Sequence, residues 1–166
     1  MKSSAPIVKR NLVQCELAAE VLRSCGNLRL RVTGHSMLPT VWPGDTLVVE
    51  PASSRDVSKG DIVLFSNGQR LVAHRLIAKD CGSGDSIETQ GDAVPRPDFP
   101  LAQECVLGKV SFILRNGQAI AANRTLRPSQ RAVAGLFRRS DFAARFVLGV
   151  HGLRNSLAQT PQVQTQ

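Results

Sequence analysis

Four side chains in the middle of the sequence are of the types that carry out acyl transfer: Ser36, His74, Asp92 and Asp98. A serine hydroxyl becomes a nucleophile when an imidazole takes its proton, and a carboxylate that accepts the other ring N–H fixes the tautomer and stabilises the imidazolium. The order of the groups along a chain is no constraint, because such a site is defined by its geometry. The four residues are therefore of types that could form a serine nucleophile with a histidine base and an aspartate partner.

Ser36 stands in residues 33–40, which read TGHSMLPT, after an alternating segment and before a proline. This place presents a serine at the end of a strand on stiff backbone, which suits a nucleophile, although many loop serines share it. Backbone N–H groups around the serine could receive an oxyanion. The adjacent His35 should point to the opposite face of an extended segment, so we expect it at the surface or in a substrate cleft and not as the base.

His74 alternates with Val72 and Leu76, which places its ring at the edge of the apolar core. A histidine there commonly makes a structural hydrogen bond, but it is also well placed to act as a general base. Asp92 and Asp98 lie on a loop that three prolines stiffen, and each could cap a turn or accept the Nδ1 proton of the imidazole. The residues alone leave both interpretations open.

The segments that must position these groups have the pattern of an antiparallel β fold. Asn67-Gly68 and Asn116-Gly117 are strong hairpin signals, and each lies between two apolar segments. The pattern predicts strands at residues 28–32, 46–50, 61–65, 71–77, 86–90, 110–114 and 119–122. Turns at about every ten residues indicate a mainly β domain, arranged as a sandwich or a barrel.

Helices are expected on both sides of this region. Apolar residues at helical spacing predict an amphipathic helix at residues 10–25, and the pattern becomes helical again after Pro128. We therefore divide the chain into an N-terminal amphipathic helix (1–27), a β catalytic domain (28–122) and a basic helical C-terminal tail (123–166).

The net formal charge of +8 is concentrated in the tail, because the residues after 110 include eight arginines and one acidic residue. We expect this tail to contact an anionic membrane peripherally, with Phe137, Phe142 and Phe146 in the interface, or alternatively to pack on the domain with solvated arginines. The sequence has no apolar run of about 18 residues and no pattern of a secretory leader, so we expect a cytoplasmic protein. Nucleic acid is not an expected partner, because aromatic residues are few.

Cys15, Cys25, Cys81 and Cys105 are widely spaced, with no CxxC motif and no Cys/His cluster. Reduced thiols are the expected state in a cytosolic chain, with a disulfide bridge as the alternative. The spacing does not fit a zinc site, and we expect neither a metal nor a cofactor. No oligomeric state is predicted.

Several short motifs occur in one order along the β region: GHSMLPT (34–40), GD (44–45), GDIVLF (60–65), VAHRLI (72–77), GD (91–92) followed by Asp98, and VLGKV (106–110). Motifs in a fixed order are much more specific than any one of them. This succession resembles the signal peptidase I family, in particular its archaeal and endoplasmic-reticulum branch, over residues 28–110. The resemblance implies a signal-peptidase- or LexA-type antiparallel β scaffold, flanked here by an N-terminal helix and a C-terminal helical tail.

The resemblance also implies a serine endopeptidase that forms an acyl-enzyme. In that family the serine before Met-x-Pro is the nucleophile, which corresponds to Ser36, and the branch with His-Arg uses the histidine as base, which corresponds to His74. Asp98 matches the final aspartate of the family's Gly-Asp-x-Asn-x-x-Asp-Asp loop and is the expected partner of the histidine, with Asp92 as the second candidate. The implied substrate is a peptide or protein, cleaved after small side chains, and no cofactor is required.

The sequence departs from that family in three places. No membrane-spanning helix precedes Ser36, His35 stands where a small residue is usual, and Ala93 and Val94 replace a polar pair. Two other functions stay open. One is a LexA-like regulatory autoprotease, which would be expected to have a lysine in place of His74 and an N-terminal DNA-binding domain. The other is a catalytically inactive peptide-binding module.

Overall fold

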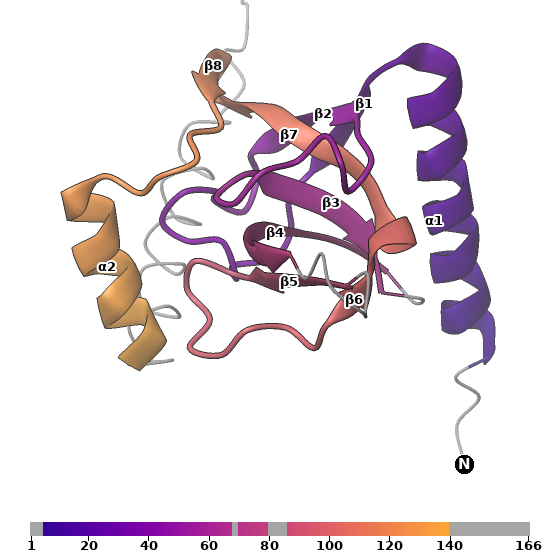
Figure 1. Cartoon of the computed structure of the whole chain (residues 1–166). Helices are drawn as coiled ribbons and strands as arrows, with labels where there is room; N and C mark the ends of the chain where they lie inside the picture. Colours follow the sequence, from indigo (N-terminus) through magenta and orange to yellow (C-terminus); the bar gives the residue numbers. More distant parts are fainter. Residues whose placement is uncertain (1–4, 68–69, 80–85, 140–166) are drawn as a thin grey trace, which may run out of the picture.

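The structure is a computed structural model, shown in Figure 1, that describes residues 5–67, 70–79 and 86–139. Its elements in chain order are α1 (Ala5–Cys25), β1 (Leu28–Arg31), β2 (Thr46–Pro51), β3 (Ile62–Ser66), β4 (Leu71–Lys79), β5 (Ser86–Gln90), β6 (Leu101–Ala102), a 3-10 turn (Gln103–Cys105), β7 (Val106–Arg115), β8 (Gln118–Ala121) and α2 (Pro128–Arg139). Predictions about Gly68, Cys81, Phe142, Phe146 and the rest of the tail after residue 139 lie outside the described residues.

The eight strands of the described chain belong to one antiparallel sheet. The strand order is β1-β2-β7-β3-β4-β5-β6, and β8 pairs with β7. The sheet curls, and α1 and α2 lie on opposite sides of the molecule (Figure 1). This confirms the predicted mainly β fold with a helix at each end. The curl also brings β1 and β4, which do not pair with each other, to one cleft.

The β7–β8 hairpin forms where Asn116-Gly117 predicts it. Both residues have positive φ, 50° for Asn116 and 79° for Gly117, as in the type I′ turn whose twist matches the two strands. The β3–β4 hairpin also has the expected partners, with Val63 opposite His74. β3 is almost wholly apolar because it lies between β4 and β7 and has four consecutive buried residues.

The larger apolar core joins α1 to the sheet. Its buried members are Leu22, Met37, Val41, Leu47, Val49, Ile62, Leu64, Val110 and Ile113. Leu22 belongs to α1, and Cys15 and Ala18 are buried on the same helix at the predicted spacing. The helix ends at Gly26, where φ is 70° and the N–H donates to Leu22 O at 3.2 Å. The helix stop and the burial of Cys15, Ala18 and Leu22 therefore agree with the sequence, whereas Leu17, another apolar residue of this helix, is 60% exposed.

Some element boundaries differ from the prediction. β7 begins at Val106 and not at 110, because Val106 is buried and pairs with Phe65 of β3. α1 begins at Ala5, earlier than the expected start at residue 10. The pattern does not predict β6, because a strand of two residues offers no alternation to detect.

The first part of the predicted tail packs on the domain. Ala134 and Phe137 of α2 are buried, so the prediction that Phe137 enters a membrane interface is wrong, and the alternative of a packing helix holds for residues 128–139. An apolar stripe on a helix has the same spacing whether its own domain or a lipid surface covers it. The sequence pattern therefore could not separate the two.

Three further observations concern the predicted chemistry and location. In the described residues no helix is long and apolar enough to cross a membrane. Cys15, Cys25 and Cys105 are free thiols. Within the same ranges, His, Cys, Asp and Glu side chains form no group of three that could hold a metal ion.

Candidate active site

Ser36 lies in the connection between β1 and β2. The next two residues, Met37 and Leu38, are 4% and 0% exposed, so they anchor this connection in apolar surroundings. Hydrogen bonds from Thr40 N and Val41 N to Met37 O, at 2.9 and 3.0 Å, fold the segment into a tight turn. The half-buried serine is therefore presented on well-supported backbone.

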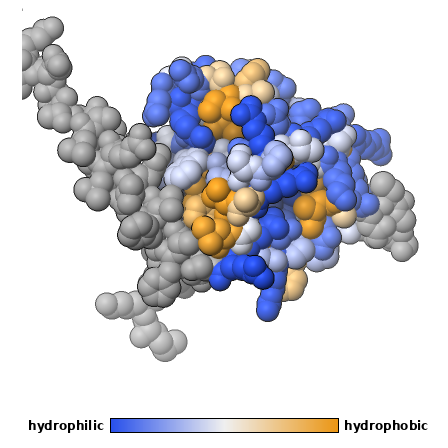
Figure 2. Space-filling model, turned by 90° about the vertical axis from the view of Figure 1, so that its left-hand side faces the viewer, coloured by the Kyte–Doolittle hydropathy of each residue, from blue (hydrophilic) through white to orange (hydrophobic). Residues whose placement is uncertain are grey.

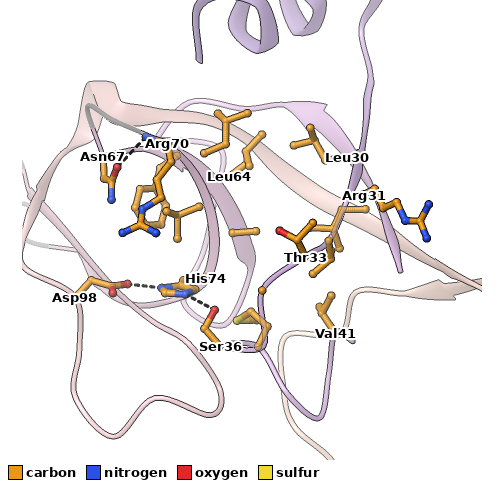
Figure 3. A pocket seen from close by; sticks show the side chains of 18 of the residues that line it. Leu30, Arg31, Thr33, Ser36, Val41, Leu64, Asn67, Arg70, His74 and Asp98 are labelled. Atoms are coloured by element: carbon orange, nitrogen blue, oxygen red, sulfur yellow. Dashed lines mark hydrogen bonds and ion pairs between the residues drawn. The ribbon is translucent and has the colours of Figure 1, made fainter. Parts of the chain in front are cut away.

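The structure brings Ser36, His74 and Asp98 together. His74 is a largely buried residue of β4, and its Nε2 is 2.9 Å from Ser36 Oγ. Its Nδ1 is 2.6 Å from Asp98 Oδ2, as Figure 3 shows. The imidazole thus lies between the hydroxyl and the carboxylate, which is the arrangement that a serine nucleophile with a histidine base requires.

Asp98 is held on its loop by Thr89 of β5. The Asp98 N–H donates to Thr89 O at 2.8 Å, and Thr89 Oγ1 donates to Asp98 Oδ2 at 2.6 Å. Burial raises the pKa of the Asp98 carboxyl, but hydrogen bonds from His74 and Thr89 lower it by more, so its pKa lies below the usual range. The carboxylate is therefore ionised at neutral pH. Sequence reasoning missed Thr89, whose only signal is its alternation with Ile87 on β5.

Asp92, the second predicted partner of His74, forms a different contact. Its two carboxylate oxygens accept hydrogen bonds from Arg75 Nε and Nη2, each at 2.8 Å, and Oδ2 also accepts one from Thr40 Oγ1. Asp92 is 2% exposed, so this is a buried ion pair. Because Arg75 follows His74 in β4, the two side chains lie on opposite faces of the strand. Of the two aspartates in this loop, Asp98 thus contacts His74 and Asp92 contacts the next residue, Arg75.

The loop that carries both aspartates, residues 91–100 (the aspartate loop), rests on the part of the β1–β2 connection around Ser36, residues 33–41 (the nucleophile segment). Ala93 N donates to Ser36 O at 2.8 Å. A Cβ at Gly91 would lie 2.6 Å from Ser36 O and 3.1 Å from Ser36 Cβ, so a larger residue would force a shift. Each residue of the Gly91-Asp92 pair therefore has a physical role. The glycine allows its backbone to approach Ser36 closely, and the aspartate forms a buried ion pair with Arg75.

A cavity of about 600 Å³ opens beside Ser36 and His74. Figure 3 shows the cavity with Leu30 and Thr33 of the β1 side on one flank and the start of β4 on the other. Its floor consists of core residues, namely Met37, Val41, Leu47 and Leu64. A cavity of this size and apolar lining can take side chains of a peptide, and the strand backbone on its flanks can pair with an extended one.

A family model described as Peptidase S24-like matches residues 9–110. The chain belongs to the Peptidase S24-like family. This confirms the broad family that the motifs indicated, which includes LexA-like and signal peptidase I-like proteins, and with it a peptidase-type or LexA-like autoprotease function. No curated protein matches the chain.

The S24-like match includes Ser36, His74, Asp92 and Asp98 and ends before β8 and α2. It therefore covers the one strand and the two loops that carry these residues. The archaeal and endoplasmic-reticulum branch, and the catalytic roles of the individual residues, stay predictions.

The rim of this S24-like cleft has a distinctive lining. Arg31 and Arg70 are exposed there, and Phe99, next to Asp98, is 92% exposed. Among the described lining residues Asp98 alone is acidic, and its carboxylate is bound by His74. Arg70 directly precedes β4, four positions before His74, and lines the same cavity. The cleft rim thus carries positive charge on the side of the candidate base.

The structure places His35 at the surface, as the sequence indicates, and Trp42 beside a small apolar cluster. His35 is exposed, although it adjoins Ser36. Trp42 is half-buried, its Nε1 donates to Pro39 O at 2.9 Å, and its ring packs against a small cluster of Leu38 and Phe137. Trp42 therefore lies at the edge of this small apolar cluster.

Proposed function

We propose that the protein is a serine peptidase that hydrolyses a peptide bond through an acyl-enzyme on Ser36, with His74 as general base and Asp98 orienting the imidazole. The observation that carries this proposal is the unbroken series of two hydrogen bonds, 2.9 Å from Ser36 Oγ to His74 Nε2 and 2.6 Å from His74 Nδ1 to Asp98 Oδ2, beside an open cleft. The S24-like family supports the reaction class.

The reaction follows from this arrangement. His74 Nε2 takes the proton of Ser36 Oγ as the oxygen attacks the peptide carbonyl carbon, and the ionised Asp98 stabilises the imidazolium that forms. Backbone N–H groups around Ser36 receive the oxyanion. The imidazolium then gives its proton to the leaving amine, and a water molecule, activated by the same imidazole, hydrolyses the ester.

The substrate in this proposal is an extended peptide held between the β1 side and the β4 side of the cleft. Strand backbone on both flanks offers main-chain hydrogen bonds, and the apolar floor receives substrate side chains. Cleavage after small side chains, as in signal peptidase I, rests on the motif resemblance, as does assignment to the branch that uses a histidine base.

A LexA-like autoprotease is the second candidate, and the S24-like family favours it. In that class a lysine is expected where this chain has His74. The two functions differ in molecularity. Self-cleavage within one molecule is first order, so its rate constant does not depend on protein concentration. Incubation of the purified chain at several concentrations, with fragment masses measured, separates the two.

The test of the proposed function is covalent labelling by a fluorophosphonate, which reports an activated serine. We expect stoichiometric labelling of Ser36 in the wild-type chain and none in Ser36→Ala. His74→Ala should lose labelling and keep its fold by circular dichroism, because the imidazole activates the hydroxyl. His35→Ala, at an exposed histidine next to the serine, is the matched control and should label normally. Labelling retained in His74→Ala would show that the base is another group.

A further inference from the structure

Helix α2 lies outside the S24-like match and yet contacts both loops of the candidate site. The match ends at residue 110, whereas α2 occupies Pro128–Arg139. Phe137 of α2 is 4% exposed and forms a small apolar cluster with Leu38, flanked by Trp42 and Ala93. Leu38 is in the nucleophile segment and Ala93 is in the aspartate loop. Phe137 therefore packs on the nucleophile segment, and Ala93 of the aspartate loop packs against the same cluster.

A polar contact connects the same helix to the aspartate loop. Arg138 Nε donates to the main-chain oxygen of Asp92 at 2.9 Å. The next residue of that loop, Ala93, donates its N–H to Ser36 O at 2.8 Å. The hydrogen bonds thus run from α2 through the loop to the backbone of the nucleophile.

The segment that leads to α2 is tied to the third part of the site. Arg75, which follows His74 in β4, donates from Nη1 to Asn123 O at 2.9 Å and to Gly60 O at 2.7 Å. The residues between β8 and α2 are therefore anchored at the strand that carries the base. All three segments of the candidate triad are in contact with the C-terminal part of the chain.

We propose that α2 is a clamp that holds the aspartate loop and the nucleophile segment in reactive register, with Phe137 and Arg138 as positioning residues. This inference rests on the proposed function and extends it to a part of the chain that the family match does not cover. The physical reason is the narrow tolerance of such a site, in which a displacement of about 1 Å typically costs about a hundredfold in rate.

The clamp is separable from the stability of the sheet. The cluster of Leu38 and Phe137 is distinct from the two larger apolar clusters, which contain the buried residues of β2, β3, β5 and β7. On the side of the molecule where α2 lies, the surface is mostly hydrophilic with separate apolar patches (Figure 2). Loss of the α2 contacts should therefore loosen the two loops locally while the sheet keeps its fold.

The first experiment compares Arg138→Ala with Arg139→Ala. Arg139 is the next residue of the same helix and is exposed, so its removal controls for charge and helix propensity. We expect the rate constant of fluorophosphonate labelling at Ser36 to fall roughly tenfold to a hundredfold in Arg138→Ala and to stay unchanged in Arg139→Ala. Methylguanidinium added to Arg138→Ala should restore part of the rate, and Arg138→Lys, which keeps a donor, should retain part of it.

The apolar half of the clamp has its own pair of variants. Phe137→Leu and Phe137→Ala should slow labelling in that order, whereas Leu136→Ala, at a residue 58% exposed, should have no effect. The thermal midpoint of unfolding is measured in parallel. The milder Phe137→Leu variant keeps the comparison informative if Phe137→Ala does not fold.

A second measurement is independent of catalysis. The amide of Ala93, which donates to Ser36 O, should exchange with solvent faster in Arg138→Ala than in the wild type. The amide of Leu76, which donates to Asp61 O at 2.8 Å within the sheet region, should be unaffected and is the internal control. Wild-type labelling rates together with unchanged Ala93 exchange in Arg138→Ala would overturn the clamp.

The two proposals fail differently. If the wild-type chain is not labelled at Ser36, the proposed peptidase function is wrong, and Ala93 exchange alone then decides whether α2 holds the loop. If the wild type is labelled and both measurements on Arg138→Ala match it, only the clamp is wrong.

Discussion

His74 and Arg75 are neighbours in β4 and belong to two different kinds of site. His74 faces the cleft, where it contacts Ser36 and Asp98, and Arg75 faces the other side, where it pairs with Asp92. One strand supplies the histidine and the arginine, and one loop supplies the aspartate that each of them contacts. Strand parity, and not residue type, therefore decides which acidic residue of the loop lies against the imidazole.

The two groups of residues differ in how many hydrogen bonds they form and in how far solvent reaches them. Arg75 donates to both oxygens of Asp92 and to main-chain oxygens, including those of Gly60 and Asn123. This network is buried, and such a network stabilises one arrangement of loops. The side chain of Asp98 is 28% exposed and Ser36 is half-buried beside the cavity. The cleft side can therefore admit a substrate, and the buried side can hold the loop that presents Asp98.

The clearest test of the difference between the two aspartates is to replace each in turn by asparagine. Asp98→Asn should lower the labelling rate constant of Ser36 by about 10⁴-fold with little loss of stability, because the amide cannot hold the productive tautomer. Asp92→Asn should instead cost about 3–5 kcal/mol of unfolding free energy, because the Arg75 charge loses its buried partner. The measurements are fluorophosphonate labelling kinetics and urea denaturation.

Each aspartate variant is the control for the other, since both change one carboxylate of the same loop to an amide. Equal losses of stability and of labelling rate in the two variants would show that the two sites are not functionally distinct.

A smaller effect is expected where the two sites meet, at Gly91. Gly91→Ala places a Cβ within 2.6 Å of Ser36 O, so the nucleophile segment must move. We expect labelling to slow by about a hundredfold, as for a displacement of about 1 Å. Gly135→Ala is the matched control, because a Cβ there meets nothing within 4 Å. Normal labelling by Gly91→Ala would mean that the close approach does not position Ser36.

A few-fold effect is expected from Arg70, which directly precedes β4 and lines the same cavity as His74. Because its charge lies at the rim, Arg70→Glu should lower kcat/KM by about twofold to fivefold for peptides with an acidic residue a few positions from the scissile bond. For peptides with a basic residue there, the same substitution should raise it. Arg55→Glu, at an exposed arginine that does not line the cavity, is the control. A charge-independent change would contradict an electrostatic role.

The smallest expected difference is in acid stability. Hydrogen bonds lower the pKa of Asp98 in the folded state, so this group stabilises the fold above its unfolded pKa of about 3.9 and loses that contribution as pH falls through the folded value. The unfolding free energies of wild type and Asp98→Asn should therefore converge as pH falls below about 3.9 and through the lowered pKa of the folded state. Denaturant titrations across that range measure the difference, and a difference that stays constant would exclude this linkage.

Much of the fold is predictable because its signals are local. The Asn116-Gly117 turn, the alternation of the strands and the stop at Gly26 each depend on residues a few positions apart. The candidates Ser36, His74 and Asp98 could also be predicted, because motif order singles them out. Their catalytic roles stay predictions.

Other features could not be predicted in this way. Thr89 contacts Asp98 nine positions further along, and nothing in the sequence around it separates it from other strand threonines. Arg75 and Thr40 are brought to Asp92 by the curl of the sheet. The packing of Phe137 on Leu38 joins residues that are far apart in the sequence, so no local pattern predicts it.

The amino-acid sequence by itself determined the β pattern, the turn positions and the types of reactive group, because these follow from backbone preferences and side-chain chemistry over short spans. The tertiary structure alone decided which aspartate meets the imidazole and that α2 closes over both loops. These outcomes depend on which face of a strand meets which loop after the sheet has curled, and that is a property of long-range packing.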